Sequence, residues 1–265
     1  MVREDRWTVT GRAGVFYLQC RPFLTFPRLV HGFSLRRDEA GADFDLGRRA
    51  VAETDEVAAR RRRFLAGLGL SGVRIVVLEQ VHGPEVAVVR SPVGEGGELF
   101  VPGADGAVTA EEGTALTIRT ADCAALLFFD PVAGVIGAAH AGWRPAAAGI
   151  AARTVEKMAS LGAAPERIAV AVGPAVGPCC YTVGEEVIGR IPAEARPEAV
   201  RKGAGGDYRL DLVALNRWWL IKAGVPAANI FSPGECTACR PEIYFSYRRE
   251  GGRAGRMMAL IARYG

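Results

Sequence analysis

The sequence predicts a single α/β domain. Short β-like apolar runs alternate with helical stretches along the chain, and no internal repeat or change of composition marks a domain boundary. With 265 residues, 49% of them hydrophobic and 23% charged, the chain is long enough to bury a large core without disulfides. We therefore expect residues 1–265 to fold as one domain.

The N-terminal part is predicted to be β-rich with one helix. Strand-like runs cover 7–9, 15–18 and 29–33. A charged, alanine-rich stretch then predicts a helix that has Thr54 as its N-cap and ends near Gly69. Its four consecutive arginines, 60–63, spread around a helix and follow acidic residues one turn upstream, so they indicate a solvated face rather than a nucleic-acid patch.

The middle of the chain is predicted to supply most of the sheet. "VRIVVLEQVHG" is typical of a strand ending in a turn, and "EVAVV" of the next strand. A loop rich in glycine and proline follows at 91–106, and then "AVTA" and "ALTIRTADC" predict two more strands. The runs 124–129 and 135–139 predict a hairpin around "DPVAG", which would make Cys123 and His140 neighbours.

The C-terminal half is predicted to alternate helices and strands. We expect a helix at 146–161, the strand "IAVAVG", a short helix at "GEEVIGRI" and a loop at "GAGGDYRL". An amphipathic helix follows, with Asp211 as its N-cap and Gly224 just after its end. The β-like pieces "NIFS", "IYFSYRR" and "RMMALIARY" complete the chain.

Composition points to a cytoplasmic protein. No stretch resembles a signal peptide, and no apolar run of 18 residues is present that could span a membrane. The net charge of +4 is small for this length and indicates no nucleic-acid partner. Six cysteines in such a chain read as free thiols, metal ligands or nucleophiles.

The residues that best suggest chemistry are histidines and one cysteine. The chain has three histidines, His31, His82 and His140, and each follows a strand-like run beside a small residue. A buried cysteine is ordinarily an inert small hydrophobe, but Cys123 beside a histidine allows two functional interpretations. Either Cys123 is a nucleophile with His140 as its base, or His82, Cys123 and His140 are three ligands of a transition metal. Such a donor set suits zinc and leaves a fourth position for a reactant.

The other cysteines and the arginines give weaker signals. Adjacent side chains tend to diverge, so we expect that Cys179 and Cys180 cannot both face one site. The C-x-x-C of Cys236 and Cys239 has no second pair nearby in the sequence, which argues against a zinc ribbon. Candidate anion-binding residues are Arg36, Arg144, Arg248, Arg249, Arg253 and Arg256.

Several segments together resemble one known family. They are "HGFSLR", "LEQVHGPEV", "DGAVTAEEGTALTIRTADCAALLFFDP", "GVIGAAHAGWR", "GPAVGPCCYTVGEEV", "LDLVALNRWWLIKAGV" and "CTACRPEIYFSYRREGGRAGRMMALI", and they span about residues 28–262. In these motifs the chain is similar to the YfiH (DUF152) family, which carries the older name multicopper polyphenol oxidase, or laccase-like. The family is described as purine nucleoside phosphorylases and, in bacteria, as a peptidoglycan editing factor.

The resemblance implies a fold, a metal site and an activity. The fold is one α/β domain with mixed sheets in α/β/β/α layers, similar to a cysteine-hydrolase toxin. The metal ligands are His82, Cys123 and His140, and the implied reactions are phosphorolysis of adenosine, inosine and methylthioadenosine, and deamination of adenosine. Zinc is the implied cofactor. Copper fits less well, because a multicopper oxidase needs many histidines and this chain has three.

The resemblance and the residues together assign roles. Asp122 is a candidate proton shuttle; Arg36, Arg144 and Arg248 are candidates for phosphate binding, and Gln80, expected on the strand face of His82, for contact with the base. The partners are then purine nucleosides and phosphate, with no nucleic acid or membrane, and a monomer is compatible with the sequence.

Two departures and two alternatives remain. Pro145 follows Arg144 where the family reads "HAGWRG", which removes one backbone donor at that turn. Glu250 replaces the usual aspartate of the family's basic loop. One alternative function is a cysteine-type amidase or hydrolase that edits peptidoglycan precursors, with Cys123 as nucleophile and His140 as base. The other is a structural zinc site or a docking module.

Overall fold

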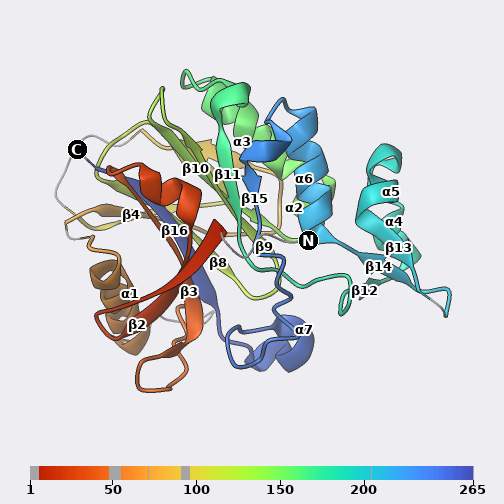
Figure 1. Cartoon of the computed structure of the whole chain (residues 1–265), viewed down its shortest axis with the longest axis horizontal. Helices are drawn as coiled ribbons and strands as arrows, with labels where there is room; N and C mark the ends of the chain where they lie inside the picture. The colour runs from red at the N-terminus through yellow and green to blue at the C-terminus, as the bar shows by residue number, and fades with distance from the viewer. Residues whose placement is uncertain (1–5, 48–54, 71, 91–95, 204, 265) are drawn as a thin grey trace.

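The computed structural model describes residues 6–47, 55–70, 72–90, 96–203 and 205–264, so the cap predicted at Thr54 lies outside it. Its largest sheet has seven strands (Figure 1). Their order is β1 (Trp7–Arg12), β2 (Val15–Cys20), β3 (Leu29–Asp38), β16 (Met257–Arg263), β8 (Thr114–Thr120), β4 (Arg74–Leu78) and β6 (Glu98–Val101). The pairs are antiparallel except those that β4 makes with β8 and β6.

A second sheet has six strands and supplies the site. Their order is β15 (Ile230–Phe231), β11 (Ala169–Val172), β9 (Ala124–Asp130), β10 (Val135–Ala141), β7 (Gly106–Thr109) and β5 (Val86–Val88). A third, three-stranded sheet has the order β12 (Thr182–Val183), β14 (Tyr208–Leu210) and β13 (Val200–Lys202). It projects to one side of the molecule in Figure 1.

Seven α-helices lie in the described part of the chain. They are α1 (Asp55–Gly67), α2 (Trp143–Ala147), α3 (Ile150–Ala159), α4 (Glu185–Ile188), α5 (Arg196–Ala199), α6 (Leu212–Lys222) and α7 (Tyr247–Glu250). Short 3-10 helices cover Arg21–Thr25, Pro165–Arg167, Ala193–Ala195, Ala227–Asn229 and Gly251–Arg253. None of these described helices has the length and apolar composition needed to cross a bilayer.

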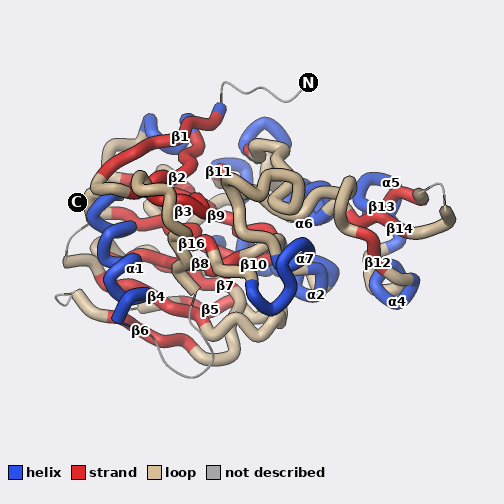
Figure 2. Tube along the Cα trace, turned by 90° about the horizontal axis from the view of Figure 1, so that it is seen from below, coloured by secondary structure: helices blue, strands red, loops and turns tan. Residues whose placement is uncertain are grey.

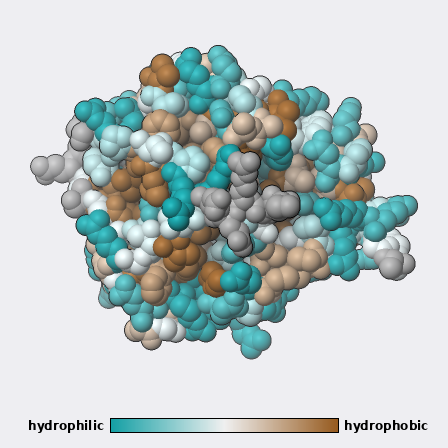
Figure 3. Space-filling view, viewed as in Figure 1, coloured by the Kyte–Doolittle hydropathy of each residue, from teal (hydrophilic) through white to brown (hydrophobic). Residues whose placement is uncertain are grey.

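The core has three parts. One lies between the six-stranded sheet and helices α3 and α6, where Phe128 and Leu215 are fully buried. A second joins residues of the two larger sheets, among them Leu116 and Leu127. The third packs Phe64 of α1 against the seven-stranded sheet. Figure 2 shows α1 and α6 on opposite sides of the molecule, and the surface in Figure 3 intersperses hydrophilic and hydrophobic residues.

The mixed α/β fold, the hairpin and the 211–224 helix are confirmed. β9 and β10 pair antiparallel, with His140 opposite Ala125. In α6, Asp211 Oδ1 accepts a hydrogen bond from the Ala214 N–H at 2.9 Å, and Gly224 follows the helix with φ 93°. These signals are local in sequence, which is why the sequence was sufficient to find them.

Four expected elements differ. The helix predicted at 146–161 is two helices, because Gly149 adopts φ 78° and separates α2 from α3. The strand predicted at "IYFSYRR" is wrong: the segment is a turn and loop that leads into α7, where Ser246 Oγ accepts the Arg249 N–H at 3.2 Å. The loop expected at 91–106 contains β6, which pairs parallel with β4. The loop expected at "GAGGDYRL" ends in β14, which pairs antiparallel with β12 and β13. Each difference reflects a cap or a pairing that hydrophobic periodicity does not report.

His31 is a core residue. It is fully buried in β3, and its Nε2 accepts the Cys20 backbone N–H at 2.8 Å, which requires an unprotonated nitrogen. Burial lowers the pKa of His31 to about 3. In the unfolded chain His31 takes up a proton near pH 6.5, whereas in the folded protein it stays neutral down to about pH 3. The contribution of His31 to the free energy of unfolding therefore has its full value above pH 6.5 and decreases as the pH falls from 6.5 toward 3.

We expect His31→Gln to flatten the pH dependence of stability. The wild type should lose about 2 kcal/mol more than the variant between pH 7 and pH 5, because the variant lacks the group that gains a proton on unfolding. Urea unfolding of both proteins at the two pH values measures the difference, and the carboxylates common to both cancel. Equal losses in the two proteins would contradict this account.

Candidate active site

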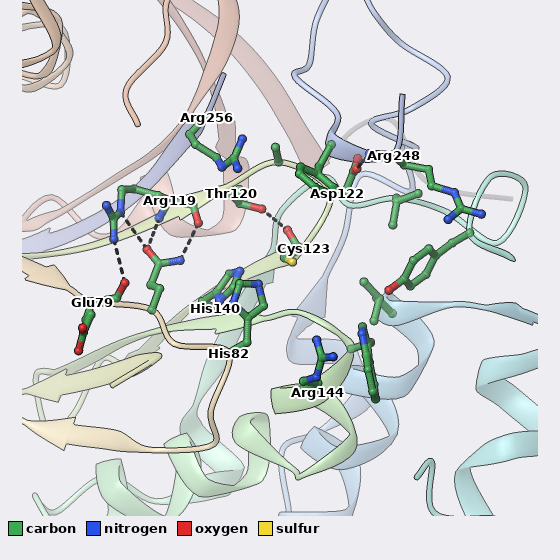
Figure 4. Close-up of a pocket in the computed structure, with 17 residues that line it drawn as sticks. Glu79, His82, Arg119, Thr120, Asp122, Cys123, His140, Arg144, Arg248 and Arg256 are labelled. Atoms are coloured by element: carbon green, nitrogen blue, oxygen red, sulfur yellow. Dashed lines mark hydrogen bonds between the residues drawn. The ribbon is translucent and has the colours of Figure 1, made fainter. Parts of the chain in front are cut away.

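Three segments bring His82, Cys123 and His140 together (Figure 4). His82 lies in the loop after β4 with φ 60°, Cys123 in the turn between β8 and β9, and His140 in β10. Their ligand atoms all lie within 4.8 Å of one another, and the two imidazole centroids are 4.8 Å apart. The β9–β10 pairing brings the end of one strand to the start of the other, so Cys123 lies next to His140.

Asp105 orients His140 and was missed by the sequence analysis. Its Oδ2 lies 2.7 Å from His140 Nδ1, its carbonyl accepts the His140 N–H at 2.7 Å, and its Oδ1 accepts the Gly83 N–H at 2.9 Å. Asp105 is fully buried. The pair fixes the imidazole so that Nε2 faces Cys123 and His82. The available signal was an acidic residue directly before a strand, in "GADGAV".

The cysteine and histidine form an ion pair. Burial alone would raise the pKa of Cys123, but the charge of His140 and hydrogen bonds from both histidines lower it to about 6. Burial alone would lower the pKa of His140, but the Cys123 thiolate and Asp105 raise it to about 9. Near pH 7 the pair is therefore a thiolate and an imidazolium, and a bound cation would replace the imidazolium proton.

The donor set fits one metal ion. Two imidazoles and a thiolate are the donors that a catalytic zinc site uses, and three protein ligands leave room for a reactant. Within the described ranges no further His, Cys, Asp or Glu joins this triad. Gly142 makes the approach of the ligands feasible, because a Cβ there would lie 2.9 Å from Cys123 Sγ and 3.3 Å from His82 Cδ2.

A cavity of about 620 Å³ opens on the triad. This volume falls in the range of about 300–1,000 Å³ typical of small-molecule sites. Besides the triad, its lining includes three aromatic residues and four arginines: Trp143, Tyr181, Tyr247, Arg119, Arg144, Arg248 and Arg256. The arrangement can hold a flat apolar group and an anion beside one metal ion.

Asp122 supports the turn that presents Cys123. It adopts φ 84°, its Oδ1 accepts the Thr237 hydroxyl at 2.5 Å, and its Oδ2 accepts the Arg248 N–H at 2.5 Å. Both carboxylate oxygens therefore have structural partners, and the geometry gives Asp122 a positioning role.

Gln80 lines the cavity, but the expected strand placement is wrong. β4 ends at Leu78, and Gln80 lies in the loop with φ 58°. Its amide holds the backbone of Arg119 from both sides: Nε2 donates to the Arg119 carbonyl at 2.7 Å and Oε1 accepts the Arg119 N–H at 2.8 Å. The prediction assumed that side chains alternate between two faces of a strand, as far as His82. That alternation ends with β4 at Leu78, because Gln80 and His82 adopt left-handed backbone conformations in the loop.

The predicted arginines separate into two groups. Arg144, whose guanidinium lies 4.4 Å from the Trp143 ring centroid, and Arg248 both line the cavity. Arg36 does not line it, since its guanidinium pairs with Asp43 at 3.1 Å and with Glu250 at 2.5 Å. Pro145 occupies the first turn of α2, where a backbone N–H has no helical partner, so the proline removes no helical hydrogen bond.

The expectation for the remaining cysteines was wrong. Sγ atoms of Cys179, Cys180, Cys236 and Cys239 all lie within 4.8 Å of one another. Residues 178–180 form a turn, and side chains of neighbouring residues diverge less in a turn than on a strand. The fold thus brings a second pair of cysteines, Cys179 and Cys180, to the C-x-x-C pair of Cys236 and Cys239.

Comparison with known proteins identifies the family. Residues 30–264 match the family model described as multi-copper polyphenol oxidoreductase laccase. The chain belongs to this family.

Named relatives of this chain act on nucleosides. It is 40% identical over 230 residues, 84% of each chain, to purine nucleoside phosphorylase YlmD of Geobacillus stearothermophilus. It is 36% identical over 203 residues, 74% of this chain and 78% of the other, to adenosine deaminase RL5 from an unknown prokaryotic organism.

Solved structures of relatives share the fold. The crystal structure of YlmD from Geobacillus stearothermophilus matches with a TM-score of 0.83 at 35% identity, covering 94% of this chain and 96% of the other. The hypothetical protein YfiH of Bacillus licheniformis matches with a TM-score of 0.84 at 28% identity, covering 96% and 98%.

We expect Gly142→Ala to impair metal binding while leaving the fold intact. The backbone of Gly142, with φ −66°, accepts alanine, so only the added methyl against Cys123 and His82 matters. The affinity of the triad for metal, measured by competition with a chelator, should fall at least about tenfold, because the three ligands must separate. Gly252→Ala is the control, since a Cβ there meets nothing within 4 Å. An unchanged affinity of the triad for metal in Gly142→Ala would refute the crowding argument.

We expect Asp105→Asn to weaken metal binding by about 10- to 100-fold, the range found for residues that orient metal-binding histidines. The amide can still bond to Gly83 or to His140, but it cannot stabilise the histidine by charge. Competition with a chelator measures the dissociation constant. An affinity equal to that of the wild type would show that Asp105 has only a packing role.

Proposed function

We propose that this protein is a zinc-dependent purine nucleoside enzyme. It would cleave adenosine, inosine and methylthioadenosine with phosphate to the free base and (methylthio)ribose 1-phosphate, and it would deaminate adenosine. The observation that carries the proposal is the convergence of two imidazoles and one thiolate at a cavity lined by aromatic residues and arginines. The names of the relatives support a reaction on purine nucleosides.

The metal site in this proposal consists of His82, Cys123 and His140. A zinc ion there would supply a Lewis acid able to activate water near neutral pH. His140 is held in one orientation by Asp105, and the turn bearing Cys123 is held by Asp122. Copper fits less well, because one three-donor site cannot assemble a multicopper cluster.

The remaining lining residues bind substrate. Arg144 and Arg248 would hold phosphate through charge-assisted hydrogen bonds, and Trp143 and Tyr181 offer ring faces to the base. Burial, and next the negative charge of the Cys123 thiolate, raise the pKa of Tyr181 to about 12, so its hydroxyl remains a neutral hydrogen-bond donor at physiological pH.

A second function draws support from the same residues. Cys123, His140 and Asp105 have the order of a nucleophile, its base and the group that orients the base, and the low pKa of Cys123 favours a thiolate. In the absence of metal the site would act as a cysteine-type amidase or hydrolase on peptidoglycan precursors.

The proposed function is accompanied by proposals about the layering of the fold, the domain organisation and the location of the protein. The three core clusters support α/β/β/α layering, and we propose that the whole chain is one catalytic domain related in fold to cysteine-hydrolase toxins. We also propose a cytoplasmic location, where free thiols are kept reduced.

We expect the wild type to cleave adenosine to adenine only when phosphate is present, and to deaminate adenosine to inosine when phosphate is absent. Cys123→Ala and His82→Ala should each lose at least about 100-fold in kcat/KM, because the metal site loses a ligand. Arg144→Ala should raise KM for phosphate about 10- to 100-fold, with Arg253→Ala as the control because Arg253 lies outside the cavity lining.

Chromatography of adenine, inosine and hypoxanthine gives the readout. Wild type without turnover, or Cys123→Ala with full turnover, would refute the nucleoside proposal. A metal-free, active protein that loses activity when iodoacetamide labels Cys123 would instead favour the hydrolase.

A further inference from the structure

We propose that Cys179, Cys180, Cys236 and Cys239 form a second metal site, which binds one structural zinc ion through four thiolates. The site is separate from the triad and does not depend on the reaction proposed above. Its four sulfurs all lie within 4.8 Å of one another.

The fold brings the two cysteine segments together. β11 and β15 are neighbouring parallel strands, with Val170 opposite Ile230. The chain therefore leaves both strands at the same end of the sheet, and the following segments continue side by side, with a bridge between Ala175 and Cys236. One segment delivers the adjacent pair and the other the C-x-x-C pair.

The distances fit a single tetrahedral ion. Zinc–sulfur bonds of about 2.3 Å place the four sulfurs of a tetrahedron about 3.8 Å apart. Cys239 Sγ lies 3.6 Å from Cys179 Sγ and 3.4 Å from Cys180 Sγ. An iron–sulfur cluster would spread its thiolates further, because several irons and sulfides lie between them. All six cysteines are free, so no disulfide uses any of these thiols.

The surroundings resemble a thiolate site. The Gly177 N–H donates to Cys236 Sγ at 3.2 Å, which stabilises a sulfur that carries negative charge. Gly177 also has to be small, since a Cβ there would lie 3.2 Å from Cys236 Cβ and 3.4 Å from Cys179 Sγ. Three basic residues and two acidic ones line the adjoining cavity, so its lining carries a small positive charge beside the sulfurs: Arg201, Lys202, Arg209, Asp211 and Glu235.

The proposed zinc would brace two parts of the cavity at the triad. Tyr181, next to Cys180, lines that cavity. Thr237, next to Cys236, donates to Asp122, and the Val176 N–H donates to the Asp122 carbonyl at 2.9 Å. Fixing the four cysteines therefore fixes the supports of the turn that presents Cys123. The ion is structural because four protein donors leave no position for a reactant.

Zinc content of the full-length protein tests the site. We expect about two zinc ions per chain in the wild type after expression with added zinc and purification under reducing conditions, and about one in either His82→Ala or Cys239→Ser. Cys239→His should retain the second ion, because three cysteines and one histidine also form structural zinc sites. Cys20→Ser is the matched control, since Cys20 is a buried cysteine outside both groups, and it should retain both ions.

A spectroscopic measurement keeps the test valid if Cys239→Ser fails to fold. Cobalt-loaded His82→Ala, in which the four cysteines are intact, should show the charge-transfer and d–d bands of a tetrahedral tetrathiolate site.

The proposal is overturned if His82→Ala, in which the four cysteines are intact, binds no zinc, or if folded Cys239→Ser binds as much zinc as the wild type. It is also overturned if His82→Ala lacks the tetrathiolate bands, if iron occupies the site, or if zinc-supplemented protein contains a disulfide between the two segments.

Discussion

The antiparallel pairing of β9 with β10 is the constraint on which the site depends. It places His140 opposite Ala125 and Ala141 opposite Ala124, so the residue that precedes β9 must lie beside the end of β10. Both strands are fully buried along their length, and a register shift of one residue would turn their side chains to the opposite faces. The hydrophobic core thus fixes the distance between a thiol and an imidazole that are 17 positions apart.

Backbone strain completes the geometry that the hairpin begins. Gln80, His82 and Asp122 all have positive φ without being glycine. Such conformations cost of order 1–3 kcal/mol each and persist where surrounding contacts enforce them. Two sets of hydrogen bonds enforce them here. The Gln80 amide bonds to the Arg119 backbone, and the Asp122 carboxylate accepts hydrogen bonds from the Thr237 hydroxyl and the Arg248 backbone N–H. The strain lies in the two loops that present His82 and Cys123, while the unstrained strand presents His140.

Residue patterns predicted what is local and missed what requires pairing between distant segments. The hairpin and the capped helix at 211–224 follow from turn residues, periodicity and an N-cap, and all of these lie within a few residues of one another. Asp105 was missed because its partner is reached only when β7 pairs with β10. The four-cysteine group was missed because it depends on β11 and β15 being parallel neighbours. Arg36 was misplaced because its acidic partners, Asp43 and Glu250, hold it outside the cavity lining.

The two cysteine-containing groups illustrate how coordination number separates chemistry from structure. At the triad, the positive charge of His140 lies between the Cys123 thiolate and the Asp105 carboxylate, so these groups stabilise one another even before a cation binds. At the four-cysteine group no histidine or acidic residue of the described chain joins the sulfurs, so four ionised thiols would repel one another unless a cation lay between them. The triad can therefore exchange its ion and a reactant without losing its geometry. The four cysteines can stay ionised beside one another only with an ion bound between them. Thr237 and Val176 connect the four-cysteine group to Asp122, which supports the turn that bears Cys123. An ion bound by the four cysteines would therefore also help to hold Cys123 in place for the ion at the triad.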